Sequence, residues 1–179
     1  MLDEKNTCLI IVDVQDKLAN LMHNKQQLFD NLTILANAAK ILNLPILWCE
    51  QNPTRLGPTI EPLREILNDQ SPIAKMSFSC TGSEDFTRKL NALNRNHAII
   101  CGIESHICVY QTAAHLLKKG YDVTIPADAV SSRTEQNLKI ALRRLRTLSA
   151  NISSVEMTLF ELLQSASHPA FKQIASLVK

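Results

Sequence analysis

Residues 98–109 read Ala-Ile-Ile-Cys-Gly-Ile-Glu-Ser-His-Ile-Cys-Val. The apolar run at 98–101 predicts a strand buried on both faces, Gly102 predicts a tight turn, and a helix is expected from Ser105. Cys108 would then lie on the first turn of that helix, where the positive end of the helix dipole favours thiolate, the nucleophilic form of cysteine. A strand, turn and helix in this order are typical of a nucleophile presented at the carboxyl edge of a sheet.

The rest of the chain repeats this alternation of short apolar runs with longer amphipathic segments. Strands are predicted at residues 9–12, 46–49, within 73–78, 97–101, 121–125 and 151–155. Helices are predicted at residues 28–42, 60–67, 83–93, 105–119 and 134–148, followed by two small helices. Strand–helix units of this length favour right-handed crossovers. We therefore expect one α/β domain over residues 1–179, with a doubly wound, mostly parallel six-stranded sheet and helices on both faces, in a Rossmann-type three-layer arrangement.

The composition of the chain argues against nucleic-acid and membrane partners. The 179 residues are 45% hydrophobic and 4% aromatic, and the formal net charge is +2. This balance gives no electrostatic reason to expect nucleic acid as a partner, and we interpret the basic run at 143–146 as a solvated helix face. No apolar run approaches the ~20 residues that cross a bilayer, so no membrane partner is expected. Residues 1–5 lead directly into a predicted strand without a visible signal peptide, which favours a cytoplasmic protein.

The cysteines also favour a reducing compartment. There are five, an odd number, and no two have Cys-x-x-Cys spacing, which argues against a disulfide framework or a zinc knot. Cys8, Cys49 and Cys101 lie in apolar runs, and we expect each to be a small core residue.

Three polar residues stand at carboxyl ends of predicted strands, where ligands bind in folds of this class. Asp13 follows the strand at 9–12, Lys75 lies within 73–78, and Cys108 follows the Gly102 turn. The carboxylate could take the thiol proton, the ammonium could stabilise the thiolate, and the thiolate could attack a carbonyl carbon. Each residue alone has an ordinary alternative, as a helix cap, a solvated lysine or a core cysteine. The prediction depends on all three occurring together.

The same residues resemble the isochorismatase-like hydrolase superfamily, which includes nicotinamidases, N-carbamoyl-amino-acid amidohydrolases and isochorismatases. The motifs are Leu-Ile-Ile-Val-Asp-Val-Gln at 9–15, Ala-Lys at 74–75, and 101–109 followed by Thr-Ala at 112–113. The resemblance extends from about residue 6 to 163. It implies the isochorismatase-like fold, with Asp13 as base, Lys75 as charge partner and Cys108 as nucleophile.

The resemblance also implies a cis peptide bond between Ile103 and Glu104. Such a turn would aim the backbone N–H groups of Glu104 and Cys108 at one point, as an oxyanion hole for a tetrahedral intermediate. An ordinary trans turn is the alternative. For the substrate pocket we expect contacts from four residues, Gln15, His23, Gln51 and Phe78.

A departure from the nicotinamidase pattern concerns metal binding. Nicotinamidases of this superfamily hold a metal through an Asp-x-His pair and a further histidine in the loop after the second strand. Residues 50–59 here contain Glu50 and no histidine. We therefore expect no metal and no other cofactor, and doubt nicotinamide as the main substrate. Isochorismatases proper lack the nucleophilic cysteine, so Cys108 also argues against that reaction.

The leading hypothesis is a metal-independent cysteine hydrolase of non-peptide C–N bonds. It would cleave a small amide, or a related acyl or carbamoyl compound, through a thioester. The alternatives are a catalytically silent scaffold or binding protein of the same fold, a nicotinamidase-like or isochorismatase-like activity, and a thiol sensor in which Cys108 is oxidised. The superfamily is commonly oligomeric, and a homo-oligomer is expected here, with residues 113–117 and 160–163 as possible contact surface. Core packing would explain these apolar residues equally well.

Overall fold

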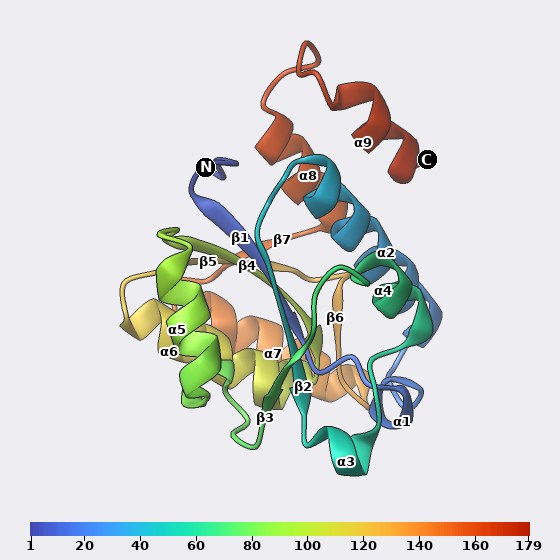
Figure 1. Cartoon of the computed structure of the whole chain (residues 1–179), viewed down its shortest axis with the longest axis vertical. Coiled ribbons are helices and arrows are strands. Elements are labelled where there is room, and N and C mark those ends of the chain that lie inside the picture. The colour runs from blue at the N-terminus through green and yellow to red at the C-terminus, as the bar shows by residue number, and fades with distance from the viewer.

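Seven strands form the central sheet of this computed structural model, which describes residues 1–179 (Figure 1). The strands are β1 (Thr7–Val12), β2 (Ile46–Gln51), β3 (Ile73–Lys75), β4 (His97–Ile103), β5 (Asp122–Pro126), β6 (Val130–Ser131) and β7 (Asn151–Ser153). Six follow the order β3-β2-β1-β4-β5-β7, and β6 pairs with the end of β4. Every pairing between them is parallel, which confirms the predicted doubly wound α/β sheet. The expected count of six strands was one short, because the two residues of β6 are too few to form a readable pattern.

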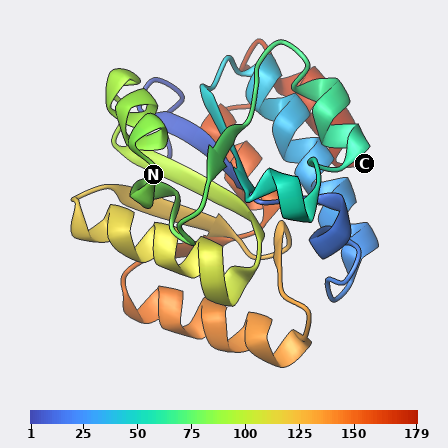
Figure 2. The same ribbon diagram turned by 60° about the horizontal axis from the view of Figure 1, so that its bottom comes forward.

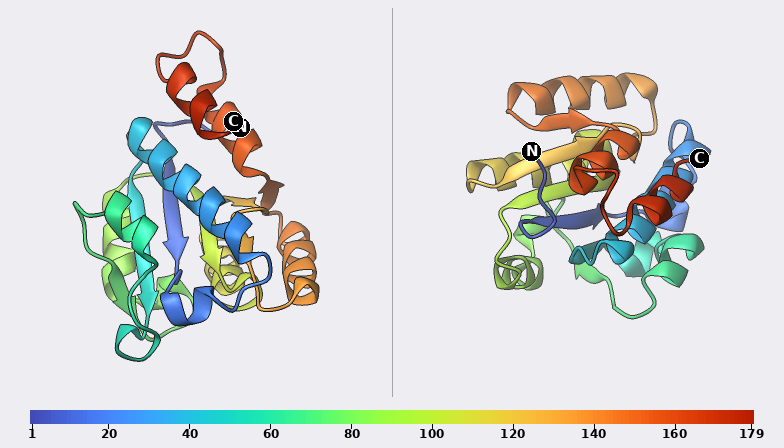
Figure 3. Two further views of the ribbon diagram at one scale, coloured as in Figure 1. Left: turned by 90° about the vertical axis from the view of Figure 1, so that its right-hand side faces the viewer. Right: turned by 90° about the horizontal axis from the view of Figure 1, so that it is seen from above.

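Helices cover both faces of the sheet, so the predicted three layers are confirmed (Figure 3). They are α1 (Asp16–Ala19), α2 (Lys25–Ile41), α3 (Pro53–Leu56), α4 (Glu61–Ile66), α5 (Glu84–Ala92), α6 (Tyr110–Lys118), α7 (Glu135–Thr147), α8 (Val155–Leu163) and α9 (Phe171–Leu177). A 3₁₀ turn, η1 (Cys80–Gly82), precedes α5, and a π turn, η2 (Ser105–Val109), precedes α6. None of the helices has the length and apolar character that crossing a lipid bilayer requires.

The side chains of β1 show how one strand serves two cores. Leu9 and Ile11 pack with the helices α2, α4, α8 and α9 on one face. Cys8, Ile10 and Val12 pack with α5, α6 and α7 on the other. Successive side chains of a strand point to opposite faces, so a strand that is covered on both sides buries all of its side chains. All six residues of β1 are buried.

Two further cysteines show the same division. Cys49 belongs to the core beside α5, α6 and α7, and Cys101 to the core beside α2. The predicted core positions of these two and of Cys8 are therefore confirmed. All five cysteines are free thiols, and all are buried.

The carboxyl ends of β1, β2, β3 and β4 meet at one edge of the sheet, which Figure 2 turns toward the viewer. Gly102 allows β4 to approach β1 closely at this edge. Its φ is +107°, and a Cβ atom there would lie 2.2 Å from the carbonyl oxygen of Val12, its partner in the parallel register. Only glycine fits such a position. The close approach brings Asp13, which follows β1, next to the turn that follows β4.

Candidate active site

Asp13 lies directly beyond β1 with its side chain turned into the protein. Its φ is +53°, a left-handed conformation that aspartate tolerates better than most residues. Its N–H donates to the carbonyl of Cys49 at 3.1 Å, which fixes the turn against β2. The residue is fully buried. A buried carboxylate of this kind needs a compensating partner.

Lys75, the last residue of β3, is that partner. Its Nζ donates to Asp13 Oδ2 at 2.7 Å and to Gln51 Oε1 at 2.8 Å, and the carbonyls of Ser77 and Phe78 lie at 3.1 and 3.0 Å. Both side chains of the Asp13–Lys75 ion pair are buried. The alternative of a solvated lysine is therefore excluded.

The pair is electrostatically coupled. Burial works to lower the pKa of Lys75, but the negative charge of Asp13, to which it also donates a hydrogen bond, acts in the opposite direction, and the pKa is raised. Burial raises the pKa of Asp13 above its ordinary value, although the Lys75 charge acts in the opposite direction. Lys75 therefore keeps its proton, and Asp13 is a stronger base than an exposed aspartate.

Cys108 is buried within η2 and completes the cluster. The charge of the Asp13 carboxylate raises the pKa of its thiol, so the two groups are close neighbours. Oδ1 of that carboxylate is buried and has no hydrogen-bond partner, which leaves it free to accept the thiol proton. The structure thus brings Asp13, Lys75 and Cys108 together at the sheet edge.

The charge state of the thiol differs from the expectation. Burial raises the pKa of Cys108 most, the Asp13 carboxylate raises it further, and Lys75 only partly offsets both. The prediction that the helix start and Lys75 hold Cys108 as a thiolate is therefore wrong for the resting site. In that state the cysteine is a neutral thiol beside the Asp13 carboxylate.

The turn between β4 and η2 leaves backbone donors unused. The peptide bond between Ile103 and Glu104 is cis. The Glu104 carbonyl accepts from the N–H groups of Ile107 at 3.0 Å and Val109 at 3.2 Å. It does not accept from the N–H of Cys108, which lies between them in the π turn. The Glu104 N–H has no acceptor in the protein. Unused N–H groups beside a buried thiol are what an oxyanion hole requires.

The Glu104 side chain has a partner that the sequence did not indicate. Its Oε2 accepts from the backbone N–H of Arg133 at 3.0 Å and from Arg133 Nε at 3.1 Å. The Glu104 carboxylate is 5% exposed and the arginine side chain 55%. The two residues are 29 positions apart, and no local pattern links them, so only the pairing of β6 with β4 could have revealed the contact.

Two of the predicted substrate contacts, Gln15 and Gln51, form hydrogen bonds with the loop and the lysine beside the site. The Gln15 amide donates to the carbonyls of Gln51 and Gly57 at 3.0 and 2.7 Å and accepts from the Gln51 N–H at 2.7 Å. The Gln51 side chain accepts from Lys75 and donates to the Met76 carbonyl at 2.8 Å. These amides hold the loop after β2 and orient the ammonium.

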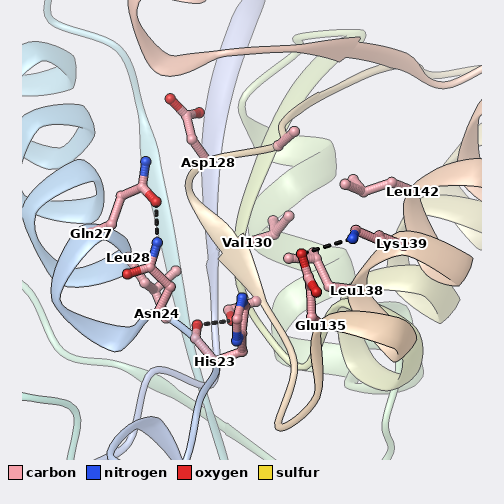
Figure 4. A pocket seen from close by; sticks show the side chains of 12 residues that line it. His23, Asn24, Gln27, Leu28, Asp128, Val130, Glu135, Leu138, Lys139 and Leu142 are labelled. Atoms are coloured by element: carbon pink, nitrogen blue, oxygen red, sulfur yellow. Dashed lines mark hydrogen bonds and ion pairs between the residues drawn. The ribbon is translucent and has the colours of Figure 1, made fainter.

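The other two predicted contacts lie at the margins. Phe78 is 55% exposed, and its carbonyl rather than its ring faces Lys75. His23 lines a cavity of about 280 Å³ between α2, β6 and α7, whose wall also includes Leu28, Asp128 and Glu135 (Figure 4). None of Asp13, Lys75 and Cys108 lines that cavity.

The carboxylate expected in the loop after β2 lies within β2 and bonds to the loop. Glu50 Oε1 accepts from the N–H and the hydroxyl of Thr59 at 2.7 and 2.8 Å. The same hydroxyl accepts from Trp48 Nε1 at 2.7 Å. No cluster of three or more histidine, cysteine, aspartate or glutamate side chains is arranged to hold a metal ion.

With this geometry in place, comparison with known proteins identifies the family. Residues 7–157 match the isochorismatase domain. The chain belongs to the isochorismatase family. It is 38% identical to the secreted isochorismatase effector Isc1 of Phytophthora sojae, over 97% of this chain and 85% of that protein. This confirms the predicted resemblance and makes the chain a member of a hydrolase family.

Solved structures show the same fold. A structure described as the MAR1 ribonuclease of Caenorhabditis elegans superimposes with a TM-score of 0.93 at 31% identity, covering 99% of this chain and 91% of that one. The Escherichia coli ycaC gene product, described as an octameric hydrolase of unknown specificity, gives a TM-score of 0.93 at 24% identity over 98% and 88% of the two chains.

Proposed function

We propose that this protein is a cysteine hydrolase that cleaves a small amide, or a related acyl or carbamoyl compound, through a thioester on Cys108. The observation that carries the proposal is the buried Asp13–Lys75 ion pair, 2.7 Å across, beside whose carboxylate the Cys108 thiol lies. Acyl transfer needs a base, a fixed positive charge and a nucleophile close together in space, and this site has all three.

The first half-reaction forms the thioester. Asp13 takes the thiol proton as Cys108 Sγ bonds to the substrate carbonyl carbon, and the carbonyl electron pair moves onto oxygen. The unused N–H of Glu104 and that of Cys108 stabilise this oxyanion. When the intermediate collapses, the C–N bond breaks, and the leaving nitrogen takes the proton from Asp13.

The second half-reaction releases the acyl group. Water adds to the thioester carbon while Asp13 takes one of its protons. The C–S bond then breaks, and Asp13 returns that proton to the sulfur. Burial raises the pKa of Asp13, which suits a group that accepts a proton twice in each cycle. Lys75 keeps its charge throughout and stabilises the thiolate each time it forms.

An isochorismatase-like reaction is the second candidate. A raised pKa also suits an aspartate that donates a proton to a vinyl ether, and Isc1 is named as an isochorismatase. That chemistry has no step for a thiol, whereas here a buried thiol lies beside Asp13. We therefore favour acyl transfer.

Intact-mass analysis tests the proposal. Wild-type protein and a Cys108→Ser variant are incubated with a panel of small amides and carbamoyl compounds and with isochorismate. The proposal expects an acyl adduct on Cys108 with at least one amide, and loss of both adduct and turnover in the variant. Turnover of isochorismate that survives the Cys108→Ser change would favour the second candidate instead.

Two broader features belong to the same proposal. We expect the working form to be a homo-oligomer acting on a small molecule, supported by the octameric state given for the Escherichia coli neighbour. A cytoplasmic location is supported by five free, buried thiols that form no disulfide.

A further inference from the structure

Glu104 contributes two groups with opposite electrostatic effects on the oxyanion. Its backbone N–H, which has no acceptor, is one donor of the proposed oxyanion hole. Its side chain is a carboxylate that is 5% exposed. Covalent bond lengths keep that carboxylate within roughly 8 Å of an atom bound to the N–H. A negative charge so close in a buried site opposes the build-up of another on the substrate oxygen.

Arg133 supplies the compensating charge. Its backbone N–H and its Nε–H both donate to Glu104 Oε2. Arg133 follows β6 by two residues, and Ser131 of β6 pairs with Ile103. The pairing of β6 with β4 therefore fixes the backbone donor, and the guanidinium adds the positive charge. Two donors from one residue hold the carboxylate in one orientation.

We propose that Arg133 is a positioning residue for acyl transfer, which neutralises and orients the Glu104 carboxylate so that the Glu104 N–H meets the oxyanion without an opposing charge beside it. The inference rests on the proposed cysteine-hydrolase function. It assigns separate tasks to two ion pairs. Asp13 and Lys75 control the proton of the thiol, and Glu104 and Arg133 control the field at the oxyanion.

Two reactions of Cys108 separate these tasks. Acylation by p-nitrophenyl acetate passes through an oxyanion, whereas alkylation by iodoacetamide replaces iodide at a saturated carbon and forms none. Both rate constants are measured at one fixed pH by intact mass for the wild type, Arg133→Gln, Arg133→Lys, Glu104→Gln and the double variant Glu104→Gln/Arg133→Gln. The matched control is Arg143→Gln, which removes the same charge from an exposed position on α7.

Arg133→Gln is expected to slow acylation about 10- to 100-fold, the effect of one uncompensated charge at this range, and to change alkylation by less than about threefold. The double variant should acylate about tenfold faster than Arg133→Gln alone, because the opposing charge is then gone. Arg133→Lys keeps the charge but loses the Nε contact, and should fall between the wild type and Arg133→Gln. The control should match the wild type in both reactions.

Other outcomes would overturn the inference. Equal slowing of acylation and alkylation in Arg133→Gln would indicate a general structural role, and so would a double variant no faster than Arg133→Gln. Normal acylation in Arg133→Gln would remove Arg133 from the mechanism and leave the proposed function intact. A wild-type protein that is alkylated but never acylated would overturn the proposed function and this inference together.

Discussion

At the scale of single residues, Asp13 has one carboxylate for two partners. Oδ2 accepts from the Lys75 ammonium, and the Cys108 thiol lies beside the same carboxylate, whose Oδ1 has no hydrogen-bond partner. The proton of the resting site therefore stays on sulfur, and the thiolate forms only when Asp13 takes that proton. For the proposed function, this arrangement favours general-base catalysis over a stored thiolate.

This arrangement predicts opposite effects of Asp13→Asn on two reactions. The change keeps the shape of the residue and its tolerance of positive φ, but removes the carboxylate charge that helps raise the pKa of Cys108. Alkylation by iodoacetamide should begin at lower pH than in the wild type, whose midpoint should lie above the ordinary value of 9.0. Hydrolysis should be lost. An Asp13→Asn protein alkylated more slowly than the wild type would contradict the assignment.

Lys75→Met should destabilise the fold through the same carboxylate. It leaves a buried negative charge without its cation, which costs about 3–5 kcal/mol in comparable buried pairs. Urea unfolding should show this loss, and the double variant Asp13→Asn/Lys75→Met should lose less than the sum of the two single losses. Additive losses would mean that the two side chains are not coupled.

At the scale of elements, the end of β4 is constrained from both sides. Gly102 faces the Val12 carbonyl, and the residues after it pair with β6 and then enter the π turn. The sequence pattern predicted the strand and the helix in their correct order, but the turn expected at Gly102 was wrong, because Gly102 lies within β4 and pairs with Val130. Helical periodicity cannot separate a π turn from an α turn at a helix start, and neither β6 nor the contact of Arg133 with Glu104 leaves a local pattern. These features come from tertiary pairing.

Gly102→Ala tests that constraint. A Cβ atom 2.2 Å from the Val12 carbonyl must push β4 away from β1, and φ of +107° is already unfavourable for alanine. We expect a loss of about 2–4 kcal/mol of unfolding free energy, together with loss of activity. Gly120→Ala is the matched control: φ is +86° and nothing lies within 4 Å, so the loss should stay near 1 kcal/mol. Equal losses in urea unfolding would rule out the close approach as the cause.

The loop from β2 to α4 bears on the metal. The loop itself has no carboxylate, and Oε1 of Glu50, near the end of β2, already accepts two hydrogen bonds from Thr59. We therefore predict that activity persists after prolonged treatment with a chelator, and that Glu50→Gln changes stability more than turnover. The measurements are elemental analysis, rates before and after chelation, and urea unfolding of the variant. Activity that chelation removes and zinc, iron or manganese restores would overturn the metal-independent mechanism.

At the scale of the whole molecule, the order of the sheet assembles the site. β1 lies between β2 and β4, and β3 lies beyond β2, so residues 13, 51, 75 and 108 reach one edge from four segments of the chain. Buried apolar strands could be read from the sequence, and parallel strands share an edge, so the convergence was predictable. The hydrogen-bonding of Gln15 and Gln51 was not, because an amide side chain leaves no signal of which backbone groups it will bond.

The two segments expected to supply contact surface are mostly buried within the protein. Ala113, Leu116, Leu162 and Leu163 belong to its cores, whereas Phe160 is 38% exposed. Other exposed apolar side chains lie elsewhere. Met76 is 71% exposed, and it lies with Phe78 in the loop after β3, where the Phe78 carbonyl accepts a hydrogen bond from Lys75. Contacts between subunits at this place would shield apolar side chains at the catalytic edge of the sheet.

We therefore predict a homo-oligomer whose subunits meet at this loop. Light scattering should give a mass that is a multiple of 20.0 kDa, and the double variant Met76→Glu/Phe78→Glu should reduce that multiple without loss of the folded circular dichroism spectrum. The matched control is Met157→Glu, an equally non-polar and exposed side chain on α8, far along the chain from the catalytic residues. It should leave the mass unchanged. A wild-type protein that is monomeric at micromolar concentration would refute the assembly, and an oligomer that survives the double variant but dissociates with Met157→Glu would place the contact on α8 instead.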